Sequence, residues 1–383
     1  MSEYQYYEFV AIDRPLTRTE MAELRSRSTR ATITPTSFTN DYERGDLKAD
    51  PADWMRRYFD AFVYTANWCS CQLALRLPHA VFKKAELKRF ATKFALTVND
   101  MGTHWVIDWS PNESENYDRF GEEDGRGWMG RLRPLRDELL RGDLRPLYLG
   151  WLAGVTAGEV GDNANEPEVP RGMAQLSAAQ KALVEFLEID PDLVAAVAAS
   201  SPVIAESNAD DNSDAWLASL PVNEMRAILK LLLESKSQQA ERQLKSHYLA
   251  WRKENAQSTA PSASQRKVSE LRTLSKEAEK HRLEYETKKR ARQEADQRKK
   301  REAYLKTLVT DFEHAWNAIH PLAERGTAAA CDDAKRAIAD LADAYALASG
   351  KEEFDRELRR FMEAHAKCKA LMRRLVEAEL WQK

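Results

Sequence analysis

Over the first 160 residues, short apolar stretches with strand character alternate with amphipathic ones. Runs rich in aromatic and β-branched residues predict strands, and these runs are 4–12, 31–39, 61–68, 71–78 and 103–109. Thr17 and Glu20 have the spacing of a capping box, which predicts a helix to about Ser26. Helices are also expected over 50–60, over 84–94 and, in two parts divided near Gly142 and Pro146, over 127–154. This pattern predicts an α+β head with about five strands.

After a loop-rich stretch at 160–172, the hydrophobic period becomes helical. Helices are predicted over 174–189 and 191–200, and Pro191 stands in a first turn, where its missing N–H costs nothing. A longer helix begins at Asn223 and can reach Arg252. The stretch 255–265, which is rich in Ser, Thr, Pro and Ala, is expected to break it.

A second long helix is predicted over 264–320, where it would extend roughly 85 Å if straight. An apolar seam begins at Leu271 and Leu274 but becomes cationic at Lys288 and Arg292. A new apolar stripe runs from Leu305 to Ile319 in a shifted phase. We therefore expect the apolar ends of this helix to dock and its middle to be solvated or paired with an acidic partner.

The last part of the chain predicts two more helices, over 331–349 and 352–381. Their apolar faces, together with Phe312, Trp316 and Ile319, are expected to form a three-helix bundle. The expected organisation is an α+β head at 1–160, an acidic helical middle at 161–235, a long basic helical arm at 236–320 with a break at 255–265, and C-terminal helices at 321–383 that pack on the end of the arm.

Charge is distributed unevenly along the 383 residues, although the net charge is only −3. Residues 161–235 carry 4 basic and 13 acidic side chains, whereas residues 236–383 carry 32 and 24. Such an acidic segment can attract the basic one within one molecule or between two copies. The charge pattern does not separate self-pairing from binding to a polyanion.

The four cysteines are too few and too scattered for a disulfide scaffold, so a reducing, cytoplasmic compartment is expected. The first residues lack the basic and apolar regions of a signal peptide. The longest apolar stretch, 147–158, is too short to span a bilayer, so no membrane association is expected.

Several stretches together resemble an uncharacterised family of bacterial proteins. The stretches are YYEFVAIDRPLTRTEMAELRSRSTRATITPTSF, RYFDAFVYTANW, GDLRPLYLGWLAG, WLASLPVNEMRAILKLLLE and REAYLKTL, and the N-terminal one is the most specific. The resemblance implies a bacterial, cytoplasmic protein. It carries no known activity and no functional residues.

Candidate sites in the head are few. Cys69 and Cys71 would share one face of a strand, but a zinc site needs about four ligands and no second pair is near. His104 has Asp108 nearby, without a nucleophile in an elbow motif. A phosphate-binding patch is possible if the basic side chains in two predicted elements come together, namely Arg25, Arg27, Arg30, Arg56 and Arg57.

Two further patterns in the head lack the sequence context that a binding site of their kind requires. The acidic residues between Glu113 and Asp124 do not have the spacing of a calcium loop. Gly125, Gly127 and Gly130 match the letters of a dinucleotide fingerprint, but no buried strand precedes them. The sequence therefore predicts no catalytic residue, no cofactor and no metal site.

The strongest candidate surface is a cluster of eight cations within fourteen residues of the long helix. Such a cluster can neutralise phosphates and release counterions, or it can be a solvated face with ion pairs such as Glu284–Lys288 and Glu294–Arg298. The candidate polyanion-binding residues are Lys288, Lys289, Arg290, Arg292, Arg298, Lys299, Lys300 and Arg301.

The leading hypothesis is a non-enzymatic interaction or scaffold protein whose coiled-coil-like arm contacts a protein partner or another copy of itself. One alternative is a nucleic-acid-associated accessory protein that uses the basic arm. Another is an enzyme with an unrecognised site in the head, near His104 or the arginine cluster. A deep polar pocket around those residues would favour the enzyme.

Overall fold

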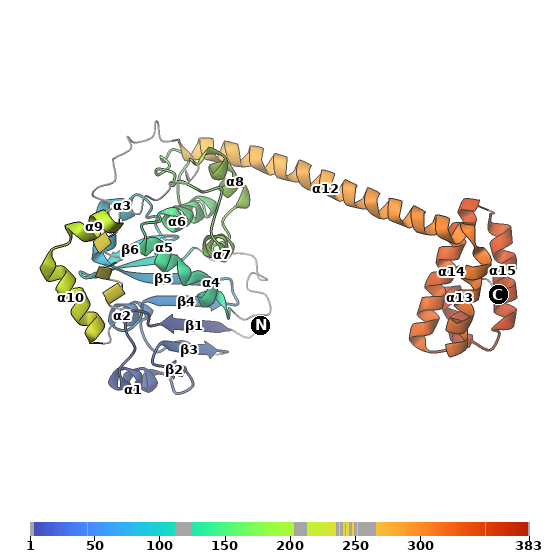
Figure 1. Ribbon diagram of the computed structural model, residues 1–383, viewed down its shortest axis with the longest axis horizontal. Helices are drawn as coiled ribbons and strands as arrows, with labels where there is room; N and C mark the ends of the chain where they lie inside the picture. Colours follow the sequence, from blue (N-terminus) through green and yellow to red (C-terminus); the bar gives the residue numbers. More distant parts are fainter. Residues whose placement is uncertain are drawn as a thin grey trace. The chain divides into compact units, whose positions relative to one another are not determined.

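The computed structural model describes residues 4–43, 45–111, 125–202, 213–234, 266–348 and 350–381, with scattered positions between 237 and 251 (Figure 1). The chain divides into two compact units, Met1–Lys280 and His281–Lys383. The first unit contains an antiparallel sheet with helices, and the second is helical. The predicted α+β class is confirmed.

The sheet of the first unit has seven strands in the order β2-β3-β1-β4-β5-β7-β6, and neighbouring strands pair in antiparallel register. The expectation of about five strands was too low, because 31–39 folds as parts of two strands and 97–100 was not recognised. The strands are β1 (Gln5–Val10), β2 (Thr32–Thr34), β3 (Ser37–Tyr42), β4 (Ala61–Ala66), β5 (Cys71–Pro78), β6 (Thr97–Asp100) and β7 (His104–Trp109).

Local signals in the sequence account for the first two helices. In the capping box of α1 (Arg18–Arg27), Thr17 Oγ1 accepts from Glu20 N at 3.2 Å and Glu20 Oε2 accepts from Thr17 N at 2.7 Å. Helix α2 (Pro51–Arg57) has Asp50 as its N-cap and Pro51 in its first turn. Both predictions are confirmed.

The two faces of the sheet carry separate cores, because successive strand residues point to opposite sides. Phe62 of β4 belongs to an aromatic core with Phe9, Phe38 and Trp54, beneath α1 and α2. Val63, the next residue, belongs to a larger core covered by helices. These helices are α3 (Lys84–Lys88), α4 (Trp128–Leu132), α5 (Pro134–Leu140), α6 (Arg145–Thr156), α7 (Ala178–Phe186) and α8 (Pro191–Ser200).

Helix α6 contains the longest apolar stretch of the sequence, and it is buried in this larger core. Its close approach to the sheet depends on Gly150, because a Cβ there would lie 2.6 Å from Trp109 Nε1. The same indole donates to Pro146 O at 3.1 Å. Stretch 127–154 forms three helices instead of the two expected, because Pro134 starts α5.

A buried network of charges joins four distant parts of the first unit. The Asp60 carboxylate, which is fully buried, accepts from the amides of Ile12 and Asp13 at 2.6 and 2.7 Å. Arg76 Nη2 contacts the same carboxylate at 2.7 Å, and Arg136 Nη2 contacts Asp13 Oδ2 at 2.8 Å. Burial alone would raise the pKa of Asp60, but the guanidinium groups of Arg76 and Arg136 outweigh it, and the pKa is lowered.

The first turns of helix α12 (Val268–Thr310) pack on the larger core of the first unit. Val268 and Leu271 are fully buried there. Just before the helix, Arg266 donates to the buried Glu166 at 2.7 and 2.9 Å, and Tyr148 donates to the same carboxylate. The chain that enters α12 is thus fixed to the first unit by apolar contacts and by a buried ion pair.

The second unit has one continuous core built by its four shorter helices. Trp316, Ile338 and Leu358 lie in this core, as the apolar spacing predicted. The expected single helix over 352–381 is instead two helices, which separate after Ala364. The four helices are α13 (Phe312–Arg325), α14 (Ala328–Ala348), α15 (Lys351–Ala364) and α16 (Lys369–Glu377).

Candidate functional site

The middle of α12 is the longest exposed surface on a single described element. The helix spans Val268–Thr310, not 264–320, because Asp311 leaves the helical conformation and caps α13 by accepting from His314 N at 2.8 Å. All residues from 279 to 304 are exposed. This stretch contains no apolar seam, so it lacks the pattern that a coiled coil requires.

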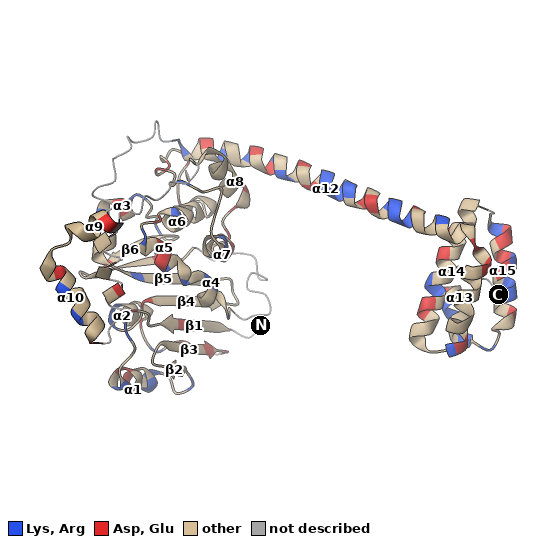
Figure 2. Ribbon diagram, in the orientation of Figure 1, with Lys and Arg blue, Asp and Glu red and all other residues tan. Residues whose placement is uncertain are grey.

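All eight predicted cations lie within this exposed stretch, and Figure 2 shows Lys and Arg recurring along α12. Arg290 pairs with Glu294 at 3.0 Å. Arg301 pairs with Asp340 and Asp343 of α14 at 2.6 and 2.8 Å, so it is occupied within the second unit. The six without an ion pair in the described chain are Lys288, Lys289, Arg292, Arg298, Lys299 and Lys300.

Five of these six cations lie on one side of the helix. At about 100° per residue, they fall within an arc of roughly 120°. Asp296 is the one acidic residue between 281 and 304 in that arc. We call the five residues the cationic stripe, and they are Lys288, Lys289, Arg292, Lys299 and Lys300.

The ion pairs expected along the helix form differently. Glu294 pairs with Arg290, four residues before it, and not with Arg298. Glu284 and Lys288 also form no ion pair in the described structure, whereas Arg282 pairs with Glu286 at 3.5 Å. The stripe is therefore less neutralised by its own helix than the sequence pattern suggested.

Three acidic side chains of the segment 161–235 are engaged locally in the first unit. Glu166 is bound by Arg266, Glu185 pairs with Arg131, and Asp162 contacts Arg272 at 3.0 Å. Helices of this segment also contribute Leu183 and Val197 to the same core as the sheet. The charge asymmetry of the sequence thus reflects, in part, pairing inside one unit.

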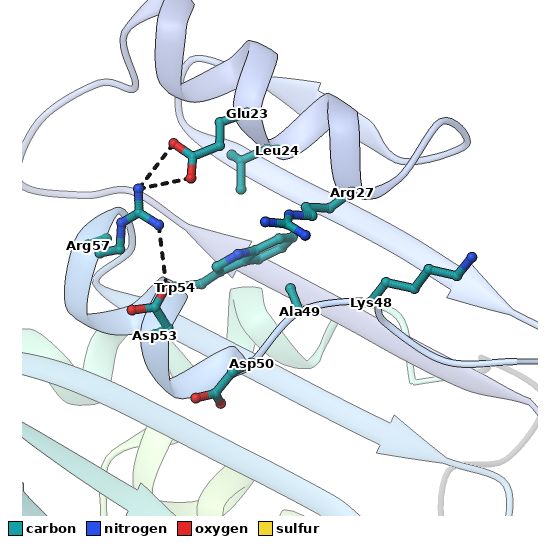
Figure 3. A pocket seen from close by; sticks show the side chains of 9 residues that line it. All are labelled: Glu23, Leu24, Arg27, Lys48, Ala49, Asp50, Asp53, Trp54 and Arg57. Atoms are coloured by element: carbon teal, nitrogen blue, oxygen red, sulfur yellow. Dashed lines mark hydrogen bonds and ion pairs between the residues drawn. The ribbon is translucent and has the colours of Figure 1, made fainter.

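The arginines proposed as a phosphate patch are only partly brought together. Arg27 and Arg57 line a pocket of about 350 Å³ between α1 and α2 with Lys48 (Figure 3). Arg57 is already paired with Glu23 at 2.9 Å, and Asp50 and Asp53 also line the pocket, so its charges balance. The remaining proposed residues do not line it: Arg25 caps backbone carbonyls, Arg56 pairs with Asp53, and Arg30 lies elsewhere.

His104 and Asp108 do not form a pair. They lie four residues apart on β7, and Asp108 accepts instead from Gln72 while His104 Nδ1 contacts Thr103 Oγ1 at 2.8 Å. Burial raises the pKa of Asp108 to about 6, against the opposing effect of the Gln72 hydrogen bond. Because neither residue holds the other in place, the geometry gives no support to a His104–Asp108 pair as a catalytic base.

The structure also bears on the remaining sequence patterns of the head. Cys69 lies in the turn between β4 and β5 and only Cys71 begins a strand, so the expected shared strand face is wrong. Gly125 and Gly127 adopt positive φ in the turn before α4. The acidic residues between Glu113 and Asp124 lie outside the described residues, as does the expected break at 255–265. The described residues hold no cluster of metal ligands.

Two histidines that the sequence analysis did not connect meet in the second unit. His320 Nδ1 and His365 Nε2 lie 2.7 Å apart, so one ring donates and the other must accept. Burial, and then the neighbouring His320, lowers the pKa of His365, while Glu324 opposes this shift. No spacing rule links residues so far apart in sequence.

This pair predicts an acid-sensitive second unit. The pKa of His365 is lower in the folded state, so the unfolded state binds more protons, and stability is lost as the pH falls below about 6.5. The midpoint of thermal unfolding of this unit should drop between pH 7.5 and pH 5. His365→Asn should flatten that dependence, whereas His314→Asn, at an exposed site, should leave it unchanged. An equally steep dependence in the His365 variant would contradict the assignment.

No protein-family model, curated protein or solved structure matches this chain. The resemblance to an uncharacterised bacterial family therefore stays a prediction. Within the described residues, no helix combines the length and apolar character needed to cross a bilayer.

Proposed function

We propose that this chain is a non-enzymatic interaction protein and that the exposed middle of α12 binds an anionic surface of a partner. The observation that carries the proposal is the cationic stripe, whose five side chains share one face and have no ion pair within the described chain. Unpaired cations on one helix face can be neutralised by a partner at little cost, because no internal pair has to be broken.

Two observations favour an external partner over pairing between copies. The exposed stretch of α12 has no apolar seam for a coiled coil. Glu166, Glu185 and Asp162, in the acidic segment, are already engaged with arginines of their own unit. We therefore expect the anionic surface that binds the stripe to belong to a different kind of molecule and not to a second copy of this chain.

Affinity purification of the full chain from its native host, with and without nuclease, tests the proposal. Exchange of Lys288, Lys289, Lys299 and Lys300 for Gln gives a stripe variant. A control variant with the same charge change replaces four exposed cations of α12 that lie outside the arc, namely Lys276, Lys280, Arg290 and Arg298. We expect the wild type and the control to retain a nuclease-resistant partner that the stripe variant loses. Equal retention by all three would rule the stripe out as the binding surface.

A second candidate, a nucleic-acid-associated accessory protein, is favoured by the spacing within the stripe. The pairs Lys288–Lys289 and Lys299–Lys300 are eleven residues apart, about three helical turns, so they repeat on one face. Because the two pairs are about 16 Å apart, they can contact separate phosphates of one nucleic acid. Nuclease-sensitive retention that depends on the stripe would favour this candidate over a protein partner.

A further inference from the structure

Two cysteines that are 37 positions apart in sequence meet in the second unit. Cys331 of α14 and Cys368, the N-cap of α16, have Sγ atoms 3.9 Å apart. A disulfide has an S–S distance of about 2.0 Å. Closure would therefore need a combined movement of about 2 Å. Rotation of the two cysteine side chains about their Cα–Cβ bonds can supply such a movement.

The two thiols differ in their exposure to solvent. Cys331 is fully buried, whereas Cys368 is half-buried at a helix start. Burial, and then the contact with Cys368, raises the pKa of the Cys331 thiol, which keeps it protonated. A small oxidant in solution would thus meet Cys368 first, and Cys331 would be the second thiol to react.

The surrounding contacts hold these two helices in place. Arg374 of α16 donates to Asp332, the neighbour of Cys331, at 2.7 Å. The amide of Cys368 donates to His365 O at 2.9 Å, and Met372 N donates to Cys368 O at 3.1 Å. The backbone on both sides of the thiol pair is therefore fixed by hydrogen bonds before any oxidation.

We propose that Cys331 and Cys368 form an intramolecular disulfide when the protein meets a hydroperoxide. The Cys368 thiol releases its proton, and the thiolate attacks one oxygen of hydrogen peroxide. The O–O bond breaks, the leaving hydroxide takes up a proton to become water, and a sulfenic acid forms. The Cys331 sulfur then attacks the Cys368 sulfur, the S–O bond breaks, and water leaves with the Cys331 proton. Together the two thiols lose two electrons and two protons, and one hydrogen peroxide is reduced to two waters. The bond links α14 to the start of α16.

Treatment of the full reduced chain with hydrogen peroxide tests this proposal. Peptide mapping without reductant should show one linked pair, Cys331–Cys368, and the free thiols counted after denaturation should fall from four to two. The thermal midpoint of the second unit should rise by about 10–20 °C, because the cross-link restricts the unfolded chain. Dithiothreitol should reverse both changes.

Matched variants separate the proposal from general oxidation. Cys331→Ser should stop at a Cys368 sulfenic acid that a dimedone probe captures, and Cys368→Ser should abolish the linked peptide. Cys69→Ser with Cys71→Ser, at buried sites of the first unit, should leave the linked peptide unchanged. Sulfinic acid at Cys368 in the wild type, links between chains, or retention of four free thiols would each overturn the proposal.

Discussion

Exchange of Lys288, Lys289, Lys299 and Lys300 for Gln is expected to remove most of the salt dependence of partner binding by α12. A partner that places phosphates against all five stripe cations should bind the wild type roughly 500-fold more weakly at 200 mM than at 50 mM salt, because each contact contributes a slope of about −0.9. With Arg292 alone remaining, the same change in salt should cost about 3-fold. A duplex titrated by fluorescence anisotropy at several salt concentrations measures both slopes for the nucleic-acid candidate.

The control variant, in which Lys276, Lys280, Arg290 and Arg298 are exchanged for Gln, has the same net charge as the stripe variant. It should keep nearly the full slope, because these residues lie on the opposite arc of the helix. If the two variants weaken binding equally, net charge and not the stripe decides affinity. A slope near zero for the wild type would reject phosphate binding altogether.

Asp60→Asn should destabilise the first unit by about 3–5 kcal/mol, because it leaves the buried Arg76 without its carboxylate. The substitution removes the charge that faces Arg76 at 2.7 Å, while Arg136 keeps its ion pair with Asp13 and its hydrogen bond to Arg76 O. Urea unfolding, monitored by the hydrogen exchange of the β4 and β5 amides, measures the decrease in the free energy of unfolding. Asp53→Asn, in a surface pair with Arg56 and Arg57, should cost less than about 1 kcal/mol and is the matched control.

The same network predicts that the stability of the first unit depends on pH. The pKa of Asp60 is lowered in the folded state, so its contribution is present above the unfolded value near 4 and is lost as the pH falls through the lowered value. Wild type and Asp60→Asn should therefore converge in stability at low pH. A constant difference down to pH 2 would show that packing, and not the carboxylate charge, causes the effect.

Local patterns predicted the parts of the fold in which neighbours in sequence determine structure. The capping box at Thr17 predicted α1, and the aromatic and β-branched run at 61–68 predicted β4. Strand β6 was not recognised because it is short and ends in Asn99 and Asp100, so its conformation depends on pairing with β7. The division between α15 and α16 was missed because no Gly or Pro marks it.

The candidate surface on α12 was predicted from the sequence because it depends on one helix and on charge. Its ion pairs were not predicted, since Arg301 reaches acids of α14, about forty residues further along the chain. The histidine pair and the pair of Cys331 and Cys368 also depend on tertiary packing. No spacing rule in a single sequence relates such distant residues.

The anchoring of Val268 and Leu271 in the larger core affects how this protein is made. Translation proceeds from the N-terminus at about 5–20 residues per second, and domains fold as they leave the ribosome. The larger core of the first unit is complete only after these two residues emerge, well after the last of the described strands. A nascent chain arrested near residue 250 should therefore bind chaperones, whereas one arrested well beyond residue 310 should not.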